Sequence, residues 1–92
     1  MAIFVLFGKY SMKGVREISA ARTAQANALV AENGGAIVGG YALLGEHDLM
    51  LIAEFPGIEE AIKTSVGLAK MFGIAFTTCP AVTLETFDKL VG

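Results

Sequence analysis

The sequence predicts an α+β fold, in which a four-stranded antiparallel sheet carries two long helices on one face. Three observations support this prediction. Four short segments are rich in β-branched and aromatic residues, which strands favour. Two longer segments have apolar residues at helical spacing, and a glycine follows each of them. The segments come in the order strand, helix, strand, strand, helix, strand, which is the ferredoxin-like βαββαβ order.

Length and composition predict one domain over residues 1–92, because no shift in composition marks a boundary. Hydrophobic residues make up 54% of the chain and charged residues 17%, against about 45–50% and about 25% in an average soluble domain. We expect part of this apolar excess to lie in an interface. The net charge is −2 and the basic residues are dispersed, so no nucleic-acid or membrane partner is expected.

The first strand is expected at residues 3–10, where both faces are apolar and therefore covered. A helix is expected at residues 20–32, with Ser19 as its N-cap and Gly34 just past its end. The segment before it is expected to form an irregular first turn. Counted at about 100° per residue, Arg22 falls in the middle of the apolar side of this helix.

A hairpin is expected next, with strands at residues 36–44 and 47–55 joined by Gly45-Glu46 in a type II′ turn. Gly39-Gly40 lies inside the first of these strands and indicates a bulge or a close approach of backbone. Counting by twos puts His47, Leu49, Leu51, Ala53 and Phe55 on one face of the second strand. The same count puts Asp48, Met50, Ile52 and Glu54 on the other face.

The second long helix is expected at residues 58–72, and its buried side is expected to consist of Ile58, Ala61, Ile62, Val66, Ala69 and Phe72. A fourth strand is expected at residues 74–82. Pro80 cannot donate a ladder hydrogen bond, which places that strand at an edge of the sheet or ends its pairing there. A short helix at residues 84–91 closes the chain.

Both long helices cover the same face of such a sheet, so the other face has nothing from its own chain to cover it. That face is apolar here, and its burial at about 25 cal/mol per Å² would outweigh the cost of association. We therefore expect a homodimer with the sheets face to face, which is a dimeric α/β barrel. A larger ring, assembled through the edge strand near Pro80, is an alternative.

The compartment is predicted from two features. The apolar run at residues 2–8 lacks a preceding basic segment and a cleavage site, so we interpret it as a strand rather than an export signal. The single cysteine, Cys79, excludes an internal disulfide and favours a reducing compartment, most simply the cytoplasm. No basic residue lies beside Cys79 in the sequence, so a buried, unreactive thiol is expected.

A set of motifs runs along nearly the whole chain and consists of Gly14-Val15-Arg16, Arg22, Gly34-Gly35, Tyr41, Gly45-Glu46-His47-Asp48, Glu54, and Pro80-Ala81-Val82-Thr83 with Phe87. Together they resemble the bacterial GYD domain family. The resemblance implies a ferredoxin-like fold of the dimeric α/β-barrel superfamily and implies no reaction, since most members have none assigned. That family is named for a Gly-Tyr-Asp signature in its hairpin. His47 stands here at the tyrosine position, so an imidazole would have to replace any role of that hydroxyl.

His47 and Asp48 are the catalytic candidates. His47 is the only histidine and lies between two acids, so it could act as a general base with Asp48 nearby. An exposed or packed turn histidine is the favoured interpretation, because no second histidine or cysteine gives metal-ligand spacing. No metal and no cofactor are therefore expected.

The candidate ligand-binding residues are Arg22, Tyr41, Asp48 and Glu54. Arg22 could hold a carboxylate or a phosphate near a helix N-terminus, but an ion pair with Asp48 is favoured. Tyr41 is expected at an edge of the barrel. Asp48 and Glu54 lie about 20 Å apart along the strand, so they do not form a carboxylate pair within one subunit. A buried acid needs a partner, so both are expected to be paired.

Two functions remain open on these residues. The favoured one is a non-enzymatic or accessory homodimer that binds a small, partly apolar molecule between sheet and helices or inside the barrel. The alternative is a cofactor-independent oxygenase or isomerase, of a kind found in the superfamily that the resemblance names, with His47 or Asp48 as base. An apolar pocket of a few hundred Å³ that reaches His47 or Asp48 would favour the enzyme.

Overall fold

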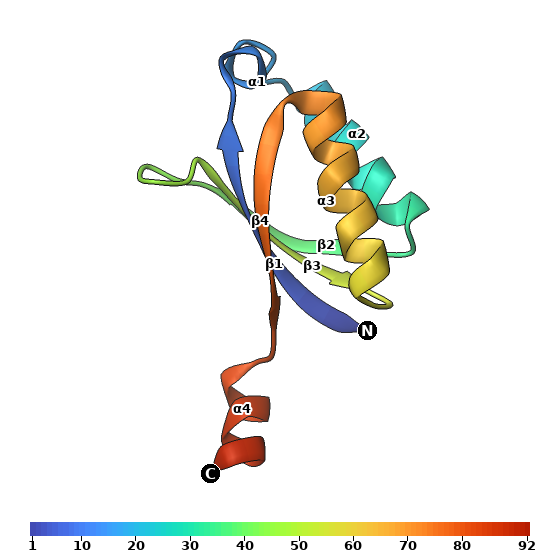
Figure 1. Ribbon diagram of the computed structural model, residues 1–92, viewed down its shortest axis with the longest axis vertical. Coiled ribbons are helices and arrows are strands. Elements are labelled where there is room, and N and C mark those ends of the chain that lie inside the picture. Colours follow the sequence, from blue (N-terminus) through green and yellow to red (C-terminus); the bar gives the residue numbers. More distant parts are fainter.

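The computed structural model describes residues 1–92 and confirms the predicted order of elements. The elements are β1 (Ala2–Tyr10), α1 (Met12–Arg16), α2 (Ala20–Glu32), β2 (Ala36–Ala42), β3 (Leu49–Phe55), α3 (Ile58–Phe72), β4 (Ile74–Ala81) and α4 (Leu84–Val91). The strands form one antiparallel sheet in the order β2-β3-β1-β4. Figure 1 shows α2 and α3 side by side on one side of this sheet. The chain therefore has the α+β, ferredoxin-like fold.

Helix α2 begins and ends where the sequence predicts. The side chain of Ser19 accepts a hydrogen bond of 3.1 Å from the backbone N–H of Arg22, and Gly34 follows the helix with φ +79°. The segment before Ser19 is not an irregular first turn of α2, as predicted, but the separate helix α1. Its own cap is Ser11, whose hydroxyl accepts from the N–H of Gly14 at 3.0 Å.

The hairpin is wider than predicted, because residues 43–48 form a connection instead of extending the strands around a two-residue turn. Gly45 does not have the positive φ that a type II′ turn requires at that position. Asp48 explains the difference. Its side chain accepts from the N–H of Tyr10 at 3.0 Å, and its carbonyl accepts from the N–H of Leu43 at 2.9 Å. These hydrogen bonds fix the end of the hairpin's paired strands at Asp48, and the residues between Leu43 and Asp48 form a loop that projects from the sheet.

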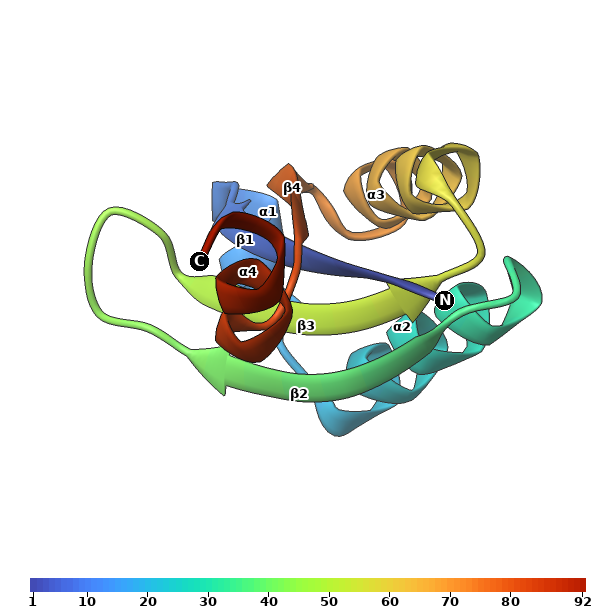
Figure 2. The same ribbon diagram turned by 90° about the horizontal axis from the view of Figure 1, so that it is seen from below.

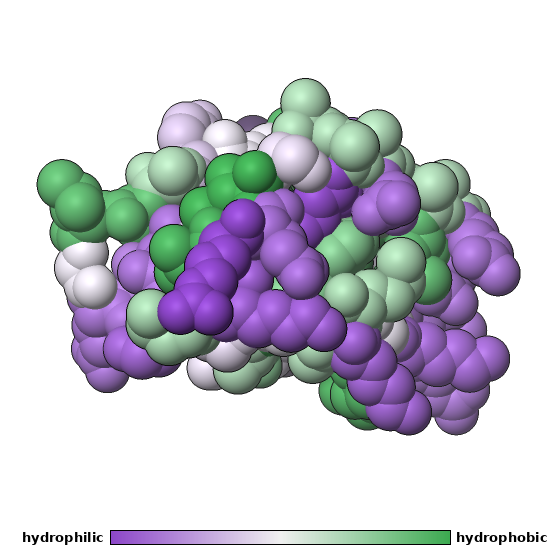
Figure 3. Space-filling view, turned by 90° about the horizontal axis from the view of Figure 1, so that it is seen from above, coloured by the Kyte–Doolittle hydropathy of each residue, from purple (hydrophilic) through white to green (hydrophobic).

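The tip of the hairpin extends away from the sheet, as seen from below in Figure 2. In the view from above, apolar atoms gather at this tip, on the left of Figure 3. Leu44 is fully exposed there. Within β2, the predicted irregularity is confirmed, since the register with β3 shifts between Ile37 and Gly39. At Gly40, an added Cβ would lie 3.1 Å from the side chain of Leu51, which explains a glycine at that position.

The core lies between the sheet and the two long helices. Its larger cluster consists of Phe4, Leu6, Val30, Ala53, Phe55 and Ala61. The rings of Phe4 and Phe55 meet edge to face, with centroids 5.9 Å apart. A second cluster, toward the other end of α3, consists of Leu68, Phe72 and Ile74.

The buried side of α3 differs from the prediction. Ala61 and Phe72 are buried as predicted, but Ile58, Ile62 and Val66 are exposed, and Thr64 and Leu68 are buried in their place. The hydroxyl of Thr64 accepts a hydrogen bond from the side chain of Asn33 at 3.0 Å and donates one to a carbonyl of its own helix. Its hydrogen-bonding capacity is therefore satisfied although it is buried. Small residues on this side let α2 approach closely, since an added Cβ at Gly67 would lie 3.0 Å from Leu29.

The sheet face opposite the helices, here called the open face, has an apolar centre. That centre consists of the half-buried side chains Ile3, Val5, Phe7, Met50 and Ile52. No helix covers it, because α2 and α3 both lie on the other side (Figure 1). Cys79 pairs with Val5 and also lies on the open face, where it is exposed. The prediction of a buried thiol is wrong for the single chain, because the strand directs this side chain away from the core.

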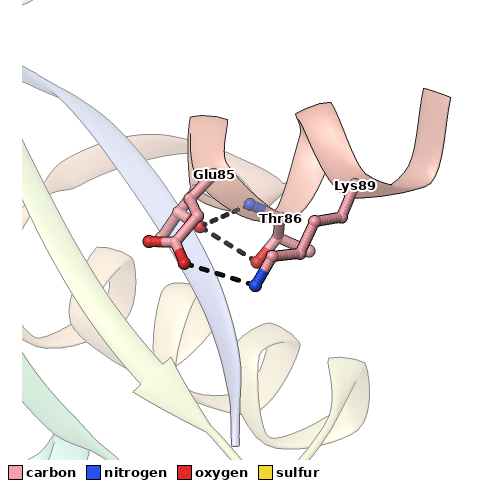
Figure 4. Close-up of polar contacts among 4 residues, drawn as sticks. Glu85, Thr86 and Lys89 are labelled. Atoms are coloured by element: carbon pink, nitrogen blue, oxygen red, sulfur yellow. Dashed lines mark hydrogen bonds and ion pairs between the residues drawn. The ribbon is translucent and has the colours of Figure 1, made fainter. Parts of the chain in front are cut away.

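Helix α4 projects beyond the sheet on its own (Figure 1). The hydroxyl of Thr83 caps it by accepting from the N–H of Thr86 at 3.1 Å, and Lys89 Nζ lies 3.3 Å from Glu85 Oε1 (Figure 4). None of its residues is buried, and Leu84 and Leu90 are exposed. No helix in the structure has the length and apolar character needed to cross a membrane.

Gly35 gives a direct test of the packing between the start of β2 and β3. A methyl group there would lie 2.6 Å from the carbonyl oxygen of Glu54 and 2.5 Å from the ring of Phe55. Gly35→Ala is therefore expected to lower the free energy of unfolding by about 1–3 kcal/mol. Gly45→Ala is the matched control, since nothing lies within 4 Å of its added methyl group. Thermal unfolding followed by circular dichroism would contradict this packing if both variants melted together.

Candidate functional site

A partly enclosed cavity of about 110 Å³ lies between the sheet and the two long helices. All four strands, α2 and α3 contribute to its walls. Nine of its eleven lining residues are hydrophobic. The lining consists of Tyr10, Arg22, Thr23, Ala26, Ile37, Leu49, Leu51, Leu68, Phe72, Ile74 and Phe76. The cavity is thus an apolar space with one ionisable cation, Arg22, in its wall.

Arg22 is held in place by contacts on several sides. It lies in the first turn of α2, and only 9% of its surface is exposed. Its Nη1 donates a hydrogen bond to the carbonyl of Gly14. Its guanidinium carbon lies 5.2 Å from the ring centroid of Tyr10 and 5.9 Å from that of Phe72. These aromatic faces attract the cation and fix its position.

The predicted ion pair between Arg22 and Asp48 is wrong, because the only ion pair in the chain joins Lys89 and Glu85. Asp48 is instead bonded to the backbone of β1 at Tyr10. No buried side-chain nitrogen or oxygen lacks a hydrogen-bond partner. The guanidinium nitrogens without a protein acceptor are therefore in contact with open space, and Arg22 lines the cavity. The positive charge of Arg22 has no acidic partner in its own chain.

The remaining candidate residues lie away from this cavity. The ring of His47 packs on Phe7 of the open face, with centroids 5.2 Å apart. Counting by twos had placed His47 with the helix-facing side chains of β3, and this is wrong because the strand begins only at Leu49. Tyr41 and Glu54 also belong to the open-face register, where they pair with Met50 and Ile3. The sheet thus separates Arg22 from His47, Tyr41 and Glu54.

A comparison with models of known protein families identifies the family of this chain. The GYD domain model matches residues 4–91. The chain belongs to the GYD domain family. No curated protein matches the chain closely enough to count as a relative.

Two further hollows of this GYD domain lie along α3 and β4. The larger part of their lining comes from the exposed ridge of α3, including Ile62 and Val66, and from Phe76. Neither His47 nor Asp48 lines any of the three hollows. No group of three or more His, Cys, Asp or Glu side chains is placed to hold a metal ion.

Sequence reasoning missed the aromatic partners of Arg22 in the GYD domain. Tyr10 ends β1 at the same parity as Phe4 and Leu6, and this parity indicated the helix-facing side of the sheet. Phe72 was expected to be buried at the end of α3, but not beside a cation. No sequence pattern connects either aromatic residue with Arg22. Their contact arises only when the end of β1, the end of α3 and the start of α2 meet.

Proposed function

We propose that this GYD domain is a homodimer that binds a small, partly apolar molecule in the cavity lined by Arg22. The observation that carries the proposal is the cavity itself, whose lining combines nine hydrophobic residues with one fixed cation, Arg22. Binding sites for small molecules are typically apolar hollows with a few polar groups that set orientation. This cavity has that composition and lies between sheet and helices.

The homodimer is proposed from the open face. Its centre contains large apolar side chains, including Val5 and Ile52, that no helix of the same chain covers. A second copy placed sheet to sheet would bury both faces at once, because a two-fold symmetric dimer uses the same surface patch on both subunits. The two copies would then form the proposed α/β barrel. The single thiol of Cys79 supports a reducing compartment such as the cytoplasm as the place of action.

The proposed binding is tested by thermal unfolding in the presence of small amphipathic molecules of matched size. The panel contains short acids, amides, alcohols and amines. A ligand present at 100 times its dissociation constant stabilises the folded protein by about 2.7 kcal/mol, which raises the melting temperature of a domain this size by roughly 10 °C or more. We expect at least one class to do so.

Two alanines of α2 supply the control variants for this test. Ala26 lines the cavity, whereas Ala24 is exposed on the same helix. Ala26→Leu fills part of the cavity and is expected to abolish the shift, and Ala24→Leu is expected to preserve it. Absence of any shift across the panel, or an unchanged shift in Ala26→Leu, would contradict binding in this cavity.

The enzymatic alternative is not favoured by an observation in the chain. It calls for a pocket that reaches His47 or Asp48, and neither residue lines one. Asp48 already accepts a backbone hydrogen bond from Tyr10 and supports the hairpin. His47 packs on Phe7. Both contacts match structural roles for these two residues.

A further inference from the structure

We infer that the molecule bound in the cavity is a short aliphatic monocarboxylate and that Arg22 is its counter-ion. This inference rests on the proposed function and specifies the chemical class of its ligand. It starts from the charge of Arg22, which is nine-tenths buried and has no acidic partner within its own chain. A buried charge without a counter-charge is costly, and removal of one partner from a buried pair is typically strongly destabilising. An anion in the cavity would supply the missing partner.

The geometry of Arg22 favours a carboxylate. One guanidinium nitrogen is bonded to the carbonyl of Gly14, and the two rings of Tyr10 and Phe72 lie within 6 Å of the guanidinium carbon. The other guanidinium nitrogens donate to no protein acceptor and keep some exposed surface, and Arg22 lines the cavity, so a ligand there can reach them. A planar guanidinium binds a carboxylate through two parallel hydrogen bonds, which fixes the orientation of the ligand. Because the guanidinium is already held, little side-chain entropy is lost on binding.

The walls of the cavity select a singly charged ligand with an apolar body. Arg22 contributes a single positive charge, and the only other lining residue that is not hydrophobic is Thr23. A phosphate carries about −1.5 to −2 charges at neutral pH, so it would leave negative charge uncompensated among hydrophobic side chains. A monocarboxylate balances the charge of Arg22, and its aliphatic part meets the leucine, isoleucine and phenylalanine walls.

The volume of the cavity limits the size of the ligand. An apolar cavity of about 150 Å³ in an engineered protein holds benzene, with its six carbon atoms. In proportion, the cavity of about 110 Å³ holds roughly four carbon atoms. The branched three-carbon body of isobutyrate is within that size, and its carboxylate would lie at the wall of the cavity beside Arg22. Its neutral amide, isobutyramide, has nearly the same shape without the charge.

The test compares these two probes by heteronuclear NMR titration of the full chain. We expect isobutyrate to bind at least about tenfold more tightly than isobutyramide, as for a hydrogen bond to a charged group. The shifts are expected at backbone amides near Tyr10 and Arg22. Arg22→Met keeps an unbranched stem about as long as the aliphatic part of arginine but removes the guanidinium charge, and we expect it to bind the acid no better than the amide. Arg16→Met, at an exposed arginine of α1, is the control and is expected to bind as the wild type does.

The outcomes separate this inference from the proposed function. Equal affinities for acid and amide, or binding of neutral or cationic compounds alone, would overturn the inference that the ligand is a carboxylate. Either result would leave the proposed small-molecule site in place. Failure of every compound in the panel to bind would overturn both. If Arg22→Met does not fold, the acid and amide comparison on the wild-type protein decides alone, because it requires no substitution.

Discussion

Val5→Glu is expected to convert the proposed dimer into a monomer. Val5 lies at the centre of the open face, between Ile52 of β3 and Cys79 of β4 in the sheet register. In a symmetric sheet-to-sheet dimer, each copy would bury a carboxylate against apolar side chains of the other. The cost of burying an ion without a partner is several kcal/mol. We therefore expect self-association to weaken by at least about 100-fold.

Sedimentation velocity at micromolar concentration measures this effect. Ile62→Glu is the matched control, because Ile62 is also apolar and exposed but lies on α3, on the other side of the sheet. It is expected to leave the dimer intact. Cys79 supplies a second readout, since its thiol should react slowly with a thiol reagent in the wild type and rapidly in Val5→Glu. A wild-type protein that sediments only as a 9.6 kDa species would refute the dimer.

Leu6→Ala is expected to cause a large loss of stability, about 2–5 kcal/mol in the free energy of unfolding. Leu6 lies on the central strand β1, is 1% exposed and belongs to the larger core cluster. Truncation removes its apolar contacts with the core and leaves a cavity that the surrounding strands can fill only in part. Leu44→Ala makes the same chemical change at the fully exposed hairpin tip and is expected to alter stability by less than about 0.5 kcal/mol.

Urea unfolding of the two leucine variants should be compared at one protein concentration, because association raises the apparent stability. A shift of the midpoint with an unchanged slope would identify a loss of stability rather than a change in the unfolded state. Similar midpoints for Leu6→Ala and Leu44→Ala would show that β1 is not packed as described.

Local signals in the sequence were sufficient for most element boundaries. Ser19 and Gly34 bracket α2, and Gly73 ends α3 with φ +66°. These residues act through their own side chains or backbone, so no knowledge of distant contacts was needed. Pro80 likewise placed β4 at an edge of the sheet, where the structure has it.

The wrong predictions concern features that distant contacts decide. The buried side of α3 depends on the hydrogen bond between Thr64 and Asn33, and hydropathy alone favoured Ile62 over Thr64. The hairpin depends on bonds from Asp48 to β1. In the candidate site, the sequence identified Arg22 by its place on an apolar helix face, but it could not supply the partners of Arg22. Those partners come from three other elements of the chain.

The register of the central strand β1 is poorly specified by hydropathy, because β1 carries apolar side chains on both faces. A slip of β1 by one residue would exchange Phe4 and Leu6 for other apolar side chains, so hydropathy alone would scarcely oppose it. Gly8 opposes it sterically, because even a methyl group there would lie 2.9 Å from the ring of Phe76. A slipped strand would force Phe7 or Lys9 into that space. The alignment of β1 is therefore decided mainly by side-chain size at the buried position of Gly8, and in one direction also by the cost of burying the charge of Lys9.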